Sequence, residues 1–76
     1  MELRKAIGVS IQRLRKERGM TMRHLEPDIS IGHLSTIENG IREASNTMLE
    51  TIAGKLEITT ANLLKEVVTE LEKDKQ

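Results

Sequence analysis

The fold of this chain is decided by a short stretch at residues 29–40, which reads ISIGHLSTIENG. Ser30 suits the N-cap of a helix, because its hydroxyl oxygen can accept a hydrogen bond from a free backbone N–H of the first turn. Leu34 and Ile37 then fall on one side of that helix. Gly40 suits its end, because glycine readily adopts the left-handed conformation that follows a helix C-terminus. The stretch therefore predicts a short helix with one apolar side.

The same signals on either side of this stretch predict more helices. Apolar spacing and capping residues place them at about residues 2–18, 22–26, 46–56 and 60–73. Pro27 ends the second, because the residue before a proline avoids helical angles. Gly8 lies inside the first, where the close approach of another helix would explain it. No useful length alternates with a period of two, so we expect a compact all-α, five-helix domain spanning residues 1–76.

The composition excludes several classes of protein. The chain has 76 residues, no cysteine and no aromatic residue. Disulfides, the usual cysteine ligands of zinc, and aromatic stacking on bases are therefore excluded. The two histidines, His24 and His33, have no partner at metal or triad spacing, so we predict a protein without catalytic activity, metal, cofactor or small-molecule ligand. No membrane span or signal peptide is evident, so we expect a cytoplasmic protein with no membrane partner.

The charge is unevenly distributed, although the net charge is zero. Residues 1–25 carry seven Lys or Arg and two Glu, a balance of +5, whereas residues 26–76 carry five Lys or Arg and ten Asp or Glu, a balance of −5. Such separation allows one face of a small domain to meet phosphate groups. A solvated helix face would also explain it.

Several motifs in order carry a family resemblance. They are LRKERGMT at 14–21, LSTIENG at 34–40, IAGKLEIT at 52–59 and LL at 63–64. Together they resemble the Cro/repressor-type helix-turn-helix family, also called the XRE family. The resemblance implies a lambda-repressor-like fold in which the second and third helices form the helix-turn-helix pair, the third being the recognition helix that enters the major groove. The second helix is shorter than is common in the family.

The resemblance also implies roles for individual residues. DNA contacts are expected from the start of the second helix, from the recognition helix and from the turn after it, namely Thr21, Met22, Arg23, Ser30, Ile31, Gly32, His33, Thr36, Asn39 and Arg42. Ile31 suits a thymine methyl group. No Arg or Gln occurs at the five likeliest groove-facing positions, which are Ser30, Ile31, Gly32, His33 and Thr36, so DNA shape is expected to contribute to specificity. Arg13, Lys16 and Arg18 are second-rank phosphate contacts. Arg15 and Glu38 match a structural ion pair.

The last predicted helix, residues 60–74, carries a wide apolar stripe with Leu64, Val67, Val68 and Leu71. Exposed apolar patches usually bind partners, so we expect a two-fold homodimer through this helix. A dimer would place two recognition helices about 34 Å apart and would bind a palindromic site on double-stranded DNA. Alternatively, the stripe only covers the chain's own core.

These observations predict a sequence-specific regulator of transcription, a repressor, encoded by a bacterium or phage and used at the nucleoid. The alternative is a protein-interaction module of the same fold, an antitoxin or a bridging factor, without direct DNA readout. The apolar Ile31-Gly32 step favours the alternative, whereas the basic N-terminal third favours DNA.

Overall fold

In the computed structural model, the described residues are 1–74, and they form four α-helices and one short 3-10 helix, with no strand among them. The elements are α1 (Leu3–Glu17), η1 (Met22–Leu25), α2 (Ile31–Glu38), α3 (Asn46–Lys55) and α4 (Thr60–Asp74). The all-helical prediction is confirmed. The count of five helices is wrong, because the second predicted segment is a single 3-10 turn.

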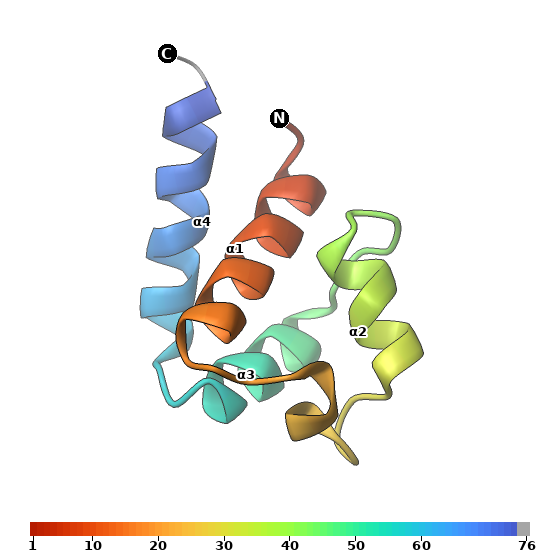
Figure 1. Cartoon of the computed structure of the whole chain (residues 1–76). Helices are drawn as coiled ribbons and strands as arrows, with labels where there is room; N and C mark the ends of the chain where they lie inside the picture. Colours follow the sequence, from red (N-terminus) through yellow and green to blue (C-terminus); the bar gives the residue numbers. More distant parts are fainter. Residues whose placement is uncertain (75–76) are drawn as a thin grey trace.

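The helices surround one aliphatic core. Figure 1 shows α1 and α4 side by side, α3 across one end of them, and α2 at the edge of the molecule away from α4. The core draws on every helix and consists of Ile11, Leu14, Leu25, Ile29, Leu34, Ile37, Leu49, Ile52, Ala53, Leu56 and Leu63. Ile58 packs against this core from the loop before α4.

Side-chain caps set the helix starts. The Ser30 hydroxyl oxygen accepts from the backbone N–H of His33 at 3.2 Å, and the Ser45 hydroxyl oxygen accepts from Met48 at 3.1 Å. Thr59 does the same before α4, accepting from the Asn62 N–H at 3.0 Å. Each cap satisfies a backbone donor that the helix itself leaves free.

Three helices end in the same hydrogen-bonded turn, in which the residue after the C-cap is left-handed. Gly19 takes this place after α1 with a φ of +65°, and Gly40 takes it after α2 with a φ of +72°. After α3 the place is held by Glu57, with a φ of +60°. A glutamate side chain strains this backbone conformation, so the third turn is less stable than the other two.

Gly8 lies where α1 crosses the end of α2. A Cβ atom on Gly8 would lie 2.6 Å from the Glu38 carbonyl oxygen and would also clash with the Ile37 carbonyl. The close approach expected from the sequence is therefore confirmed, and it brings α2 against α1.

Candidate DNA-binding surface

The outward side of α2 is the centre of the candidate surface. Leu34, Ile37 and Glu38 are buried, and they hold α2 against the rest of the molecule. Gly32 and Asn39 are exposed, and the remaining residues of this side are half-buried. The structure thus presents α2 at the edge of the molecule with one face open to solvent (Figure 1).

Hydrogen bonds within α2 limit what each polar side chain can offer to DNA. The Thr36 hydroxyl donates to the His33 carbonyl at 2.7 Å, so its oxygen is left as an acceptor for an outside donor. The Asn39 amide nitrogen donates to the Ser35 carbonyl at 2.9 Å and to the Ser35 hydroxyl at 3.4 Å, which leaves its oxygen as an acceptor. Ser30 accepts in the helix cap and keeps its O–H for an outside acceptor.

The short helix η1 precedes α2 and contacts it. The backbone N–H of Thr21 donates to Nδ1 of His24 at 2.8 Å, which closes the first turn, and Thr21 and Arg23 are exposed. Met22 is half-buried and packs against the aliphatic core. The DNA contact expected of Met22 stays a prediction, and the part of its side chain on the core gains burial there.

The turn after α2 places the backbone of Arg42 against the last turn of α2. The backbone N–H groups of Ile41 and Arg42 both donate to the Thr36 carbonyl, at 2.9 and 3.2 Å. The Arg42 side chain is exposed. Ile41, which sequence reasoning missed, is 69% exposed next to it. In the sequence, only the placement of this isoleucine directly after the glycine that ends α2 could have indicated it.

A buried ion pair joins α1 to the end of α2. Nε of Arg15 donates to Oε2 of Glu38 at 2.7 Å, and Nη2 donates to Oε1 at 3.0 Å. The remaining nitrogen, Nη1, donates to the Met20 carbonyl at 2.8 Å. The hydrogen bond to Glu38 raises the pKa of the Arg15 guanidinium above its ordinary value, against the opposing effect of burial. The pair therefore fixes α2 on α1 through a two-pronged contact.

Tertiary contacts change which cations are available to phosphate. Nη2 of Arg13 donates to Glu66 on α4 at 2.7 Å, and the same guanidinium lies 3.4 Å from both Glu17 and Glu70. The hydrogen bond to Glu66 raises the pKa of Arg13. Arg13 is therefore a link between helices, which corrects its place among the phosphate contacts. Lys16, Arg18 and Arg23 are exposed, as a phosphate contact requires.

No protein-family model matches the chain, and no curated protein sequence matches it. Solved structures do match. One structure of the clp gene regulator ClgR from Corynebacterium glutamicum is 31% identical, with a TM-score of 0.84 over 91% of this chain and 92% of that one. A second structure of the same regulator is 29% identical, with a TM-score of 0.91 over 97% of this chain and 81% of that one.

This chain belongs to the XRE family of helix-turn-helix proteins. A second member of known structure is the restriction-modification controller protein C.Esp1396I. It was solved as a tetramer in complex with its natural 35 base-pair operator. That structure is 25% identical to this chain, with a TM-score of 0.83 over 92% of this chain and 95% of that one.

The apolar stripe of α4, unlike the surface on α2, is divided between core and solvent. Leu64 and Val68 are 44% and 54% exposed, and Leu71 is half-buried. Val67 is only 2% exposed and belongs to the molecule's own interior. Val67 is therefore removed from the predicted dimer contacts, because adjacent residues of a helix are rotated by about 100° and Val67 faces inward where Val68 faces outward.

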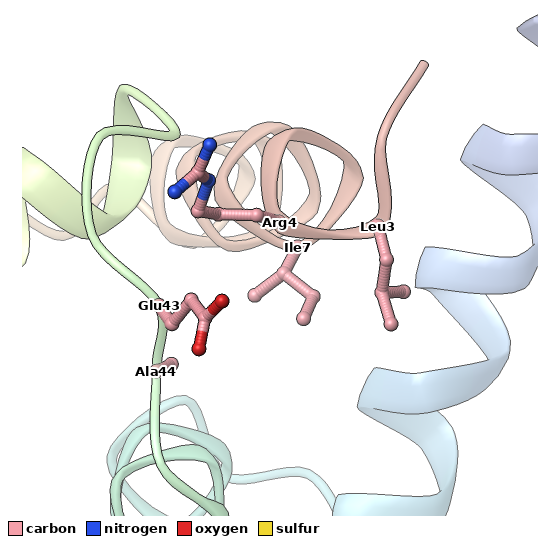
Figure 2. Close-up of a pocket in the computed structure, with 5 residues that line it drawn as sticks. All are labelled: Leu3, Arg4, Ile7, Glu43 and Ala44. Carbon is pink, nitrogen blue, oxygen red and sulfur yellow. The ribbon is translucent and has the colours of Figure 1, made fainter.

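A shallow hollow of about 270 Å³ opens between the start of α1 and the loop before α3. Figure 2 shows Leu3 and Ile7 projecting from α1 into it, with Glu43 and Ala44 on the opposite wall. Leu3 is 57% exposed. It adds an apolar side chain to the surface of the molecule near α4 (Figure 2).

Two kinds of feature are absent from residues 1–74. Within this range, no three His, Asp or Glu side chains are grouped in a way that would hold a metal ion. None of the helices described is both long enough and apolar enough to cross a lipid bilayer.

Proposed function

We propose that this XRE-family protein is a sequence-specific, double-stranded DNA-binding regulator, a repressor that binds a palindromic operator as a homodimer. The observation that carries the proposal is the outward face of α2, held by the Arg15–Glu38 pair and flanked by the exposed Arg23 and Arg42. The operator complex of C.Esp1396I supports it, because that protein shares this fold and binds base-paired DNA. As a regulator it has no catalytic role and acts in the cytoplasm, where the DNA is.

Different residues of this surface contact the phosphates and the bases of DNA. Arg23, Arg42, Lys16 and Arg18 supply exposed cations for the DNA backbone, and Thr21 is the exposed N-cap of η1. Base contacts come from α2 itself. No arginine or glutamine side chain lies on α2, so the two-pronged contacts that usually read guanine and adenine are absent from it. Sequence preference then rests on His33, Thr36 and apolar contact, with DNA shape contributing.

Dimerisation through Leu64, Val68 and Leu71 agrees with the placement of α2. In Figure 1, α4 and α2 lie at opposite edges of the molecule, whose extents are 37 × 23 × 22 Å. Recognition helices one DNA turn apart, about 34 Å, each lie about 17 Å from the two-fold axis. An axis beside α4 would leave α2 on the far side of each subunit from the partner, as two separated recognition helices require.

Selection of bound duplexes from a random library tests the DNA proposal. We expect palindromic sequences, with an affinity that falls steeply as salt rises. A library that yields no enriched duplex, with binding no better than to arbitrary DNA, would contradict it. The protein-interaction module, an antitoxin or bridging factor, would then be the better description of the same fold.

Sedimentation equilibrium tests the dimer separately. Val68→Asp places a charge on the exposed stripe and should convert a dimer at tens of micromolar into a monomer with unchanged helix content. Asn62→Asp, also at an exposed position of α4 but away from the stripe, is the matched control and should remain dimeric. A parent protein that sediments as a monomer would show that the stripe covers only its own core.

A further inference from the structure

Gly32 has no role in the protein's own packing that explains why it is a glycine. A Cβ atom added there would meet no heavy atom within 4 Å, and its φ is not in the left-handed region. The contrast with Gly8 is direct, since a side chain at Gly8 would strike the backbone of α2. Glycine is among the least favourable residues in a helix, so Gly32 lowers the stability of α2 without any compensating contact in the folded monomer.

The position of Gly32 indicates which contact, outside the folded monomer, could compensate for this loss of helix stability. An α-helix turns by about 100° per residue. Leu34, Ile37 and Glu38 form the buried side of α2, and Gly32 lies almost directly opposite the middle of that side. The missing side chain is therefore on the side of α2 that faces away from the molecule, where Gly32 is exposed. There the helix backbone can come closest to an outside surface.

Ile31 precedes Gly32 and lies on the flank of α2 between Gly32 and the buried Glu38. It is half-buried and has no hydrogen-bonding side-chain atom. On the major-groove edges of the four bases, the apolar group that such a side chain can contact is the C5 methyl of thymine. Reaching it requires a close approach of the helix to the floor of the groove. A side chain at position 32 would hold the helix away.

We propose that the Ile31-Gly32 step reads a thymine in each half of the operator, with Gly32 allowing close approach and Ile31 contacting the thymine methyl. This inference rests on the proposed function and specifies what the same surface recognises. The inference also gives the apolar start of α2 a role in DNA binding. From the sequence alone, this apolar start favoured binding to a protein partner.

Removal of single methyl groups tests the Ile31 contact. In the palindromic duplex recovered by selection, each symmetric pair of thymines is replaced in turn by deoxyuridine. Replacement of one of these pairs should lower the affinity roughly fourfold for each methyl group removed, as expected for the loss of one buried methyl group. With Ile31→Ala, the same replacement should change the affinity by less than twofold. If no replacement matters, or if the effect is unchanged in Ile31→Ala, the proposed contact is wrong.

Gly32→Ala tests the close approach. The variant should have the same or a higher melting temperature and yet bind the operator at least tenfold more weakly. Gly54→Ala is the matched control, because Gly54 is also an exposed helical glycine with nothing within 4 Å, but on α3. It should bind within twofold of the parent.

The outcomes of these experiments distinguish a failure of this inference from a failure of the proposed DNA-binding function. A Gly32→Ala protein that binds as well as the parent overturns the close approach while leaving DNA binding intact. A selection that recovers no duplex overturns the proposed function and this inference together.

Discussion

Arg15 and Glu38 form a two-pronged ion pair inside the molecule, with nitrogen–oxygen distances of 2.7 and 3.0 Å between α1 and the last residue of α2. Their side chains are 7% and 1% exposed. A buried pair of this kind gains little over a well-packed apolar pair, but breaking it leaves an uncompensated charge. The pair therefore determines how firmly the recognition helix is held on α1.

Glu38→Gln should lower the free energy of unfolding by about 3 kcal/mol, because it leaves the Arg15 cation buried without a counter-charge. Urea denaturation followed by circular dichroism measures this. The raised pKa of Arg15 means that its stabilising effect is present at all pH values below the unfolded-state pKa. The loss should therefore be the same at pH 7 and pH 10, since arginine stays charged throughout.

Lys55→Gln is the control for that measurement. It removes the partly exposed pair between Lys55 and Asp28, at 2.8 Å, and should cost less than about 1 kcal/mol. If Glu38→Gln costs no more than this control, the Arg15–Glu38 pair does not hold α2 in place.

Gly8→Ala should destabilise the protein by about 2 kcal/mol, although alanine is the better helix former. The reason is the clash of the new Cβ atom with the carbonyl groups of Ile37 and Glu38. Thermal unfolding of the variant beside Gly54→Ala checks it, because the Gly54 position is open and should tolerate alanine or gain stability. Equal melting temperatures for the two variants would show that α1 and α2 do not approach as closely as described.

Glu57→Gly should stabilise the protein by about 0.5–1 kcal/mol, since glycine adopts the left-handed conformation after α3 without strain. Glu57→Gln separates the backbone effect from the charge, because it removes the carboxylate and keeps the strained conformation. We expect only a few tenths of a kcal/mol from Glu57→Gln. Chemical denaturation of both variants measures the free energy of unfolding. If the glutamine variant is stabilised as much as the glycine variant, backbone strain at Glu57 is not the cause.

Arg42→Ala should weaken binding to all duplexes alike and reduce the slope of log affinity against log salt by about one, as expected for one lost phosphate contact. Titrations at several salt concentrations measure the slope. Arg13→Gln provides the comparison, because Arg13 is occupied by Glu66 and should leave the slope unchanged. If the slope falls for Arg13→Gln and not for Arg42→Ala, then Arg13 contacts phosphate and Arg42 does not.

Short-range signals in the sequence were sufficient to predict most of the fold. Ser30, Ser45 and Thr59 mark helix starts, and Gly19 and Gly40 mark helix ends, within a residue of where the structure has them. A cap acts on backbone groups two or three residues away, so it can be recognised without any knowledge of the tertiary fold. The positions of Leu34 and Ile37 on the buried side of α2 follow from local periodicity in the same way.

The sequence by itself determined where the helices lie and which apolar sides they bury, because capping and periodicity act within a few residues along the chain. Only the tertiary structure decided which charged and apolar side chains remain free for a partner. Arg13 is paired with a carboxylate 53 residues away, and Val67 is buried whereas its neighbour Val68 is not. These outcomes depend on how each helix is rotated against the next, which the packing of the whole core sets and which no short stretch of the chain records.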